Sequence, residues 1–327
     1  IRLRRSTDAG ASWSPATTVV DHRDFAGGGP INNFVCIADR ISGAVHVLFC
    51  HDYARVYSMS STDDGVTFST PRDVTRTFES FRPRYPWRVV AVGPGHGIQL
   101  DTGRLVVPVW FSDGTGTEFG PGKRGHRPSE LGVVYSDDAG ASWRPGDMVV
   151  RNETRFRNPN ETCAVQLSDG RVLFNTRTEA HRHRRLITTS PNGATHWSEP
   201  RFDARLVEPI CFGSTIGFDR MGQRHIVFAN PGVLERTLPD GPRRRGIAPN
   251  ETGRPFDRKR LTVRLSTDDC RTWSASRVLE EGPSGYSDLT VLPDGTILCL
   301  YECGTVTGMY DDRYLRLARF DADWIRG

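Results

Sequence analysis

A short turn motif that recurs along the chain constrains the fold more than any other feature. Its pattern is Ser-x-Asp-x-Gly-x-x-aromatic, and copies begin at Ser6, Ser61, Ser136, Ser190 and Ser266. The serine and aspartate side chains of such a motif bond nearby backbone amides, and the glycine accepts a positive φ. We call each copy a boxed turn and expect its aromatic residue to pack the turn against a sheet. We favour this structural role over the alternative, in which the boxed turns themselves bind a ligand.

Two copies depart from the pattern. The fourth copy is degenerate, because Asn192 stands in place of the aspartate and the glycine comes one residue early. The fifth copy has Cys270 where glycine is expected.

A second repeat alternates with the boxed turns. Short runs rich in β-forming residues flank glycine-containing turns, as in Cys163–Leu167 with Arg171–Arg177 and Leu289–Leu292 with Thr296–Tyr301. These runs predict β-hairpins. A hairpin, a strand, a boxed turn and a further strand make one four-stranded propeller blade. The chain is therefore expected to be an all-β, six-bladed β-propeller forming one domain over 1–327, whose first blade is incomplete because its N-terminal hairpin is missing.

Composition agrees with this fold class and argues against several others. The chain has 33 glycines and 21 prolines, which suits a structure with many turns. No apolar run is long enough to span a membrane. The net charge of +4 comes from scattered basic residues, so nucleic-acid binding is not expected. The seven cysteines lack the spacing of a zinc or redox site, and we expect neither a metal nor a cofactor.

Two of the predicted hairpins place polar side chains at the end opposite their turns. A turn centred on Asp169 sets Glu161 against Arg177, give or take one residue, and the last hairpin sets Tyr286 against Glu302 in the same way. The inner strands of a propeller end at the central channel, where a ligand site is natural. Spacing alone nevertheless favours an ordinary surface ion pair and a core tyrosine, since exposed ion pairs are common and contribute little to stability.

Longer segments around these residues resemble the sialidase family. Gly282–Leu289 is similar to the segment that carries the nucleophilic tyrosine of sialidases. Asn158–Thr162 and Asn175–Arg177 are similar to the segments of their glutamate and of one carboxylate-binding arginine, and Phe256–Val263 resembles the segment of a second one. Two further segments also look like parts of the family, Ala91–Leu100 and Leu206–Pro209. The boxed turns match the Asp boxes of sialidases, which other propellers share, so the tyrosine, glutamate and arginine segments carry the specificity.

The resemblance implies an exo-α-sialidase that hydrolyses terminal α-linked sialic acid with retention of configuration. Tyr286 would be the nucleophile, deprotonated by Glu161, because a neutral tyrosine avoids the repulsion between a carboxylate nucleophile and the substrate carboxylate. Arg177 and Arg258 would hold that substrate carboxylate through bidentate hydrogen bonds. The implied partners are sialylated glycoproteins, glycolipids or oligosaccharides.

Several alternatives stay open at this point. Arg254 and Arg260 lie close enough in sequence to replace Arg258 as the second arginine. Trp110 and Phe111 follow a predicted inner strand, where lining of a glycan pocket and core packing are about equally expected. A non-catalytic propeller that binds sialoglycans, and a trans-sialidase, would both carry the features described so far.

The start of the chain departs from the family pattern. Sialidases have a further arginine in an Arg-Ile-Pro segment and an acid/base aspartate ahead of the first boxed turn, whereas this chain opens at Ile1 directly before that turn. We therefore expect a fragment of a longer enzyme, one that alone hydrolyses sialosides poorly, because proton delivery contributes roughly 10²–10⁴-fold. Without a starting methionine or a signal peptide the sequence does not define a compartment, and secreted and periplasmic locations stay open.

Overall fold

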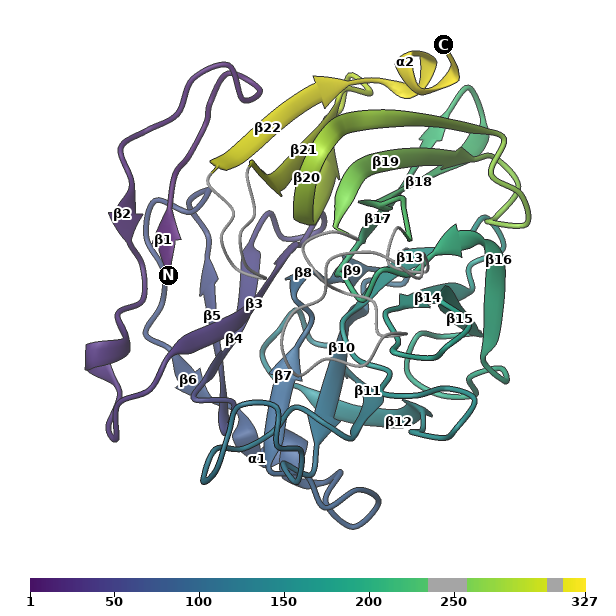
Figure 1. The fold of residues 1–327 in the computed structure, drawn as a ribbon. Helices are drawn as coiled ribbons and strands as arrows, with labels where there is room; N and C mark the ends of the chain where they lie inside the picture. Colours follow the sequence, from purple (N-terminus) through teal and green to yellow (C-terminus); the bar gives the residue numbers. More distant parts are fainter. Residues whose placement is uncertain (235–257, 305–313) are drawn as a thin grey trace. The chain divides into compact units, whose positions relative to one another are not determined.

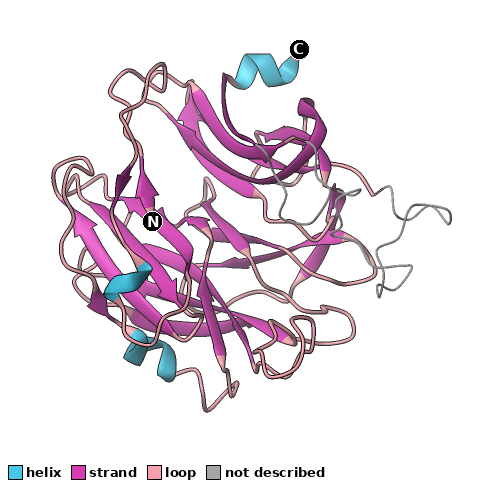
Figure 2. Cartoon of the chain, turned by 60° about the vertical axis from the view of Figure 1, so that its left-hand side comes forward, coloured by secondary structure: helices cyan, strands magenta, loops and turns pink. Residues whose placement is uncertain are grey.

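Strands account for most of the regular structure in the computed structural model, which describes residues 1–234, 258–304 and 314–327 (Figure 1). The helical elements are all short: η1 (His22–Asp24), α1 (Thr75–Glu79) and α2 (Ala322–Arg326). No helix in these three ranges has the length and apolar character needed to cross a bilayer. Figure 2 shows strands as the dominant element, and the prediction of an all-β fold is confirmed.

The chain divides into two compact units. The first unit comprises Ile1–Asn152, Asn158–Ala164 and Thr189–Ser198. The second unit comprises Glu153–Arg157, Val165–Thr188 and Glu199–Gly327. The single domain over 1–327 stays a prediction.

The first unit contains two five-stranded sheets and one two-stranded ribbon, β1-β2. One sheet has the order β6-β5-β4-β3-β8, and in the other β12-β11-β10-β7 follow one another while β9 also pairs with β10. The strands of this unit are β1 (Arg2–Leu3), β2 (Thr17–Thr18), β3 (Ile31–Ala38), β4 (Val45–His51), β5 (Arg55–Ser61), β6 (Arg72–Asp73), β7 (Val89–Val92), β8 (Gly95–His96), β9 (Ile98–Gln99), β10 (Leu105–Ser112), β11 (Ser129–Ser136) and β12 (Arg144–Val150). Apart from the parallel pairing of β8 with β3, the neighbouring strands of these sheets are antiparallel, as in the predicted blade pattern.

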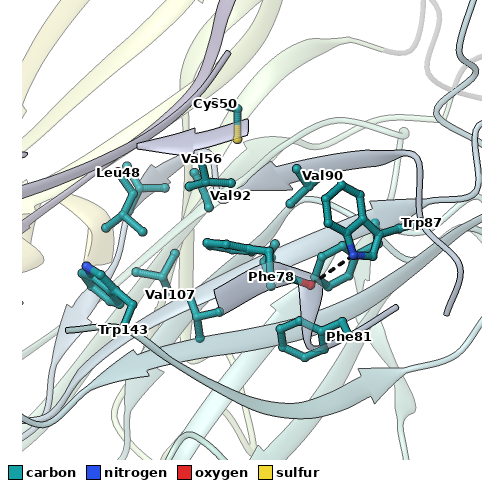
Figure 3. Packing of buried hydrophobic residues seen from close by; sticks show 14 of the residues in the cluster. Leu48, Cys50, Val56, Phe78, Phe81, Trp87, Val90, Val92, Val107 and Trp143 are labelled. Carbon is teal, nitrogen blue, oxygen red and sulfur yellow. Dashed lines mark hydrogen bonds between the residues drawn. The ribbon is translucent and has the colours of Figure 1, made fainter. Parts of the chain in front are cut away.

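Aromatic and branched side chains fill the space beside these sheets. Figure 3 shows Phe78, Phe81 and Trp87 packed among valines of the neighbouring strands. The indole N–H of Trp87 donates to the Phe78 carbonyl at 3.1 Å, so this buried polar group is satisfied. Phe111 belongs to the same cluster and is fully buried, and Trp110 is buried as well. Both residues therefore pack as core residues and do not present an open face to a glycan.

Two further sheets follow along the chain. One has the order β13-β14-β15-β16 and the other the order β17-β18-β19-β20-β21-β22. Their strands are β13 (Thr162–Gln166), β14 (Val172–Thr176), β15 (Arg184–Ser190), β16 (Arg201–Val207), β17 (Ser214–Arg220), β18 (Gln223–Pro231), β19 (Lys259–Ser266), β20 (Ala275–Val291), β21 (Ile297–Cys303) and β22 (Tyr314–Phe320). Over the described residues, four sheets have more than two strands, and six blades stay a prediction.

The long strand β20 belongs to two hairpins. Its first part pairs with β19, from Ala275 to Pro283, and its second part pairs with β21, from Ser284 to Val291. The hairpin predicted from the sequence took only Leu289–Leu292 as its first strand, whereas β20 already begins at Ala275. The strand changes partner between Pro283 and Ser284, shortly before Tyr286.

The boxed turns have the hydrogen bonds that their sequence predicts. In the second copy the Gly65 N–H donates to Ser61 Oγ at 2.8 Å, and Asp63 accepts from the Thr67 N–H at 2.9 Å and from the Thr67 hydroxyl at 2.6 Å. The residue before the glycine, Asp64, also has a positive φ of 56°. The hydrogen bonding expected of a boxed turn is thereby confirmed for this copy.

Individual copies of the repeat differ in how they fit this geometry. Cys270 keeps the glycine geometry, with φ of 61° and its N–H bonded to Ser266 Oγ at 2.9 Å. Trp13, the aromatic residue of the first boxed turn, is 44% exposed, so the expectation that it packs against a sheet is wrong for this copy. Trp143 of the third copy is buried and donates to Ser58 Oγ at 3.2 Å, as expected.

Candidate active site

The candidate nucleophile, Tyr286, lies in the second unit on strand β20 and is half-buried. Its phenol oxygen accepts a hydrogen bond of 2.9 Å from Arg177 Nη1. Its backbone N–H donates to Glu302 Oε2 at 2.8 Å, and its ring lies 5.6 Å from the ring of Phe212. The tyrosine is therefore fixed at its backbone, along its ring and at its phenol oxygen.

The register of β20 and β21 explains why Tyr286 occupies this place. From Ser287 opposite Tyr301 to Val291 opposite Ile297, the pairs are those that a turn centred on Asp294 predicts. The register then shifts between Ser284 and Ser287, which places an irregularity at Tyr286. Bulges of this kind re-aim a side chain out of the alternation of the strand. The predicted opposition of Tyr286 and Glu302 is present here as a bond from the backbone to the carboxylate.

Arg177 comes directly after β14 and is only 8% exposed. A guanidinium that donates to a phenol oxygen favours the ionised form of that phenol. Burial weakens competition from water, so the bond is worth more here than it would be on the surface. The interpretation of Arg177 as one half of a surface ion pair is wrong, because the residue is buried and contacts Tyr286.

Arg258 comes directly before β19 and is 6% exposed. Its Nη2 donates to the Ile210 carbonyl at 2.6 Å, and its Cζ lies 5.6 Å from the centre of the Tyr286 ring. Arg260 is instead exposed and lies 3.2 Å from Glu281. Arg254 falls outside the described residues. Of the two described candidates, Arg258 is thus the one brought beside Tyr286.

Glu161 belongs to the first unit, where it directly precedes β13 and is 9% exposed. Its backbone N–H donates to Asn160 Oδ1 at 2.7 Å, which fixes the local turn. Its pairing with Arg177 and its approach to Tyr286 stay predictions.

The segment after β16 contributes residues to which the sequence assigned no role. Ile210 supplies the carbonyl that binds Arg258, and Phe212 supplies the ring beside Tyr286. Glu208 is fully buried, and burial raises its pKa, while the positive charges of Arg185 and Arg177 oppose the rise. The only sequence signal for this segment was the family-like run Leu206–Pro209.

The second unit thus places one buried guanidinium group against the phenol oxygen of Tyr286 and a second one beside its ring. Such an arrangement suits a nucleophile that attacks beside a bound carboxylate. Among the residues of the three described ranges, no group of three or more histidine, cysteine, aspartate or glutamate side chains is arranged to hold a metal ion.

Comparison with known proteins identifies the family. Residues 1–299 match the family model of the BNR repeat-like domain. The chain is 28% identical over 356 residues to a sialidase of Micromonospora viridifaciens and 29% identical over 304 residues to sialidase-3 of Bos taurus. The chain belongs to the sialidase family. The alignment with the Micromonospora sialidase covers all of this chain and 47% of that protein. The alignment with the bovine protein covers 83% of this chain and 67% of that protein. The chain thus spans about half to two thirds of the length of these relatives.

Solved sialidase structures share the fold. The Hadza microbial sialidase Hz136 has a TM-score of 0.74 at 22% identity, over 99% of this chain and 60% of that chain. The intramolecular trans-sialidase of Ruminococcus gnavus has a TM-score of 0.73 at 17% identity, over 99% of this chain and 88% of that chain. At these identities the likeness establishes the sialidase fold, and the roles of individual residues rest on the site itself.

Proposed function

We propose that this protein is an exo-α-sialidase that removes terminal α-linked sialic acid from glycoproteins, glycolipids or oligosaccharides with retention of configuration. The observation that carries the proposal is the 2.9 Å hydrogen bond from buried Arg177 to the phenol oxygen of Tyr286, with Arg258 5.6 Å from the same ring. A core tyrosine needs one partner for its hydroxyl, but it does not need two buried positive charges, each of which costs desolvation. A substrate that brings its own negative charge accounts for both arginines.

Each residue has a defined task in the proposed reaction. Tyr286 Oη forms a bond to the anomeric carbon while the bond from that carbon to the leaving-group oxygen breaks, and that oxygen takes up a proton from solvent. Glu161 takes the phenolic proton, and Arg177 stabilises the negative charge that develops on Oη. A water molecule then attacks the anomeric carbon and the bond from that carbon to Oη breaks. Glu161 returns the phenolic proton to Oη, and the proton lost by the water passes to solvent as sialic acid leaves.

The two arginines also explain the choice of a tyrosine. The anomeric carbon of sialic acid bears a carboxylate, so an ionised aspartate or glutamate would approach it against like charge. Arg177 and Arg258 neutralise the substrate carboxylate through planar forks of N–H donors. The neutral phenol approaches without repulsion and becomes charged only as it reacts.

The proposal includes a six-bladed propeller. Alternation of hairpins and boxed turns supports it, as does the likeness to solved sialidases. A trans-sialidase is a second candidate, since solved structures with this fold include intramolecular trans-sialidases of Ruminococcus gnavus and of the leech. Product analysis separates the two, because hydrolysis yields free sialic acid, whereas an intramolecular transfer yields an anhydro sugar.

The decisive experiment compares the complete protein with its Tyr286→Phe variant on a fluorogenic α-sialoside. Tyr301→Phe is a matched control, since this buried tyrosine lies on the same hairpin, opposite Ser287. The parent and the control are expected to release the fluorophore, and Tyr286→Phe is expected to lose turnover by at least about 10³-fold, as for other removed nucleophiles. Retained turnover in Tyr286→Phe would exclude Tyr286 as nucleophile. A folded parent that binds sialosides without cleaving them would indicate a glycan-binding propeller.

A further inference from the structure

A buried ion pair lies behind the two arginines. Arg185 on β15 and Glu208 after β16 have fully buried side chains, and Arg185 Nη1 lies 2.6 Å from Glu208 Oε2. Such pairs contribute little net stability, because desolvation of both charges offsets their attraction. Stability alone is therefore a poor explanation for this pair, and its further contacts indicate another role.

The first set of contacts leads to Arg258. Glu208 Oε1 accepts a hydrogen bond of 3.0 Å from the Cys211 N–H, and Arg185 Nη1 donates to the Cys211 carbonyl at 3.2 Å. Together they close a turn in which Ile210 has a φ of 56°. A β-branched residue rarely adopts this strained conformation, which persists only where the surroundings impose it. The carbonyl of Ile210 is the acceptor that holds Arg258 Nη2 at 2.6 Å.

The second set of contacts leads to Arg177. Arg185 Nε donates to Asn175 Oδ1 at 2.6 Å, and Arg185 Nη2 donates to the Asn175 carbonyl at 2.8 Å. Asn175 lies on β14, two residues before Arg177. Alternate residues of a strand share a face, so fixing Asn175 also fixes the end of the strand from which Arg177 projects.

We propose that Arg185 and Glu208 are positioning residues that act through Asn175 and Ile210 to hold Arg177 and Arg258 ready for the substrate carboxylate. Neither residue of the pair needs to touch the substrate for this role. The inference rests on the proposed function and deepens it, since it assigns the specificity for an anionic sugar to a pair behind the site.

Glu208→Gln in the complete protein tests the inference. The amide keeps the size of the side chain and an acceptor for the Cys211 N–H, but it removes the charge that holds Arg185. We expect kcat/KM for an α-sialoside to fall by about 10- to 100-fold, mainly through KM, because small displacements of binding groups have effects of this order.

A charge-specific readout separates positioning from general damage. The planar analogue 2,3-didehydro-N-acetylneuraminic acid and its methyl ester differ in the negative charge that the arginines would bind. We expect Glu208→Gln to weaken binding of the acid by at least about tenfold and to leave the ester within about twofold, because only the acid pairs with the guanidinium groups. An unchanged ratio of the two dissociation constants overturns the inference.

Asp203→Asn is the matched control. Asp203 is a buried carboxylate on β16 that accepts from the Arg205 N–H at 2.9 Å and from the Trp273 indole at 3.4 Å. Its substitution is expected to lower the free energy of unfolding while the preference for the acid over the ester stays that of the parent. If Glu208→Gln does not fold, Arg185→Lys keeps the positive charge but loses the planar fork, and the same loss of preference is expected.

The inference and the proposed function can fail separately. A parent that does not cleave sialosides contradicts the proposed function. The Nε–H resonances of Arg177 and Arg258, measured by NMR in the parent and in Glu208→Gln, report their orientation without any substrate. Unchanged resonances would overturn the positioning role whether or not the parent is active.

Discussion

Arg177 donates a hydrogen bond of 2.9 Å to the phenol oxygen of Tyr286, although the two residues lie 109 positions apart in the chain. The contact joins the end of β14 to the irregular part of β20. In the proposed reaction this guanidinium stabilises the phenolate and bonds the substrate carboxylate through its planar fork. The predictions that follow test this arrangement and the turns that support the sheets.

Replacement of Arg177 by lysine is expected to lower kcat/KM for an α-sialoside by about 10²–10³-fold. Lysine keeps the charge, but a point charge cannot bond the phenol oxygen and a carboxylate with a planar fork. Arg171→Lys is the control, because Arg171 is an exposed residue of the same hairpin whose guanidinium bonds Asp169 in the turn. Steady-state kinetics of the complete protein measure both. Equal activity of Arg177→Lys and the parent would contradict the assigned role.

Arg258 and Arg260 are two positions apart in the chain but lie in different surroundings. The same substitution at each of them therefore decides which is the second substrate-binding arginine. Arg258→Lys is expected to raise KM by about tenfold or more, since it removes a fork held by Ile210 beside Tyr286. Arg260→Lys is expected to stay within about twofold of the parent, because exposed ion pairs such as that with Glu281 contribute little. A larger effect at Arg260 would move the second substrate-binding arginine to that residue.

The boxed turns predict a loss of stability in acid. Bonds from the Thr67 hydroxyl and N–H lower the pKa of Asp63 from 3.8 to about 2. Because the folded pKa lies below the unfolded one, the stabilisation is present above pH of about 4 and is lost as the pH falls toward about 2. Asp63→Asn is expected to make the unfolding free energy less dependent on pH across this window. Urea unfolding at several pH values measures this, and a slope equal to that of the parent would contradict it.

The sequence predicted well what local chemistry determines. The hairpin of β20 and β21 follows from the turn at Asp294 and the period of two in a strand, so the pairing from Ser287 to Val291 could be predicted. The irregularity at Tyr286 could not, because it depends on how β20 changes partner. The orientation of the Arg258 side chain could not be predicted either. It is set by the carbonyl of Ile210, a residue 48 positions away that has a positive φ.

A pair of glycines at the same position of two boxed turns separates backbone strain from crowding. Gly65 and Gly140 have φ of 75° and 76°, so an alanine at either site carries the same cost for a left-handed conformation, about 1–2 kcal/mol. A Cβ at Gly65 would meet Leu3 and Phe68 at 3.7 Å, which is ordinary contact. A Cβ at Gly140 would lie 2.6 Å from Nδ1 of His46, a buried ring whose Nε2 is 3.5 Å from Asp39.

Gly140→Ala is therefore expected to lower the free energy of unfolding by about 1–3 kcal/mol more than Gly65→Ala, because the buried ring must move to make room. Denaturant unfolding followed by tryptophan fluorescence gives both values under one condition. His46→Ala in the Gly140→Ala background should recover most of the difference between the two glycines, since it removes the clashing ring. Equal losses at the two glycines would show that His46 moves aside at no cost and that the left-handed backbone alone sets the requirement for glycine.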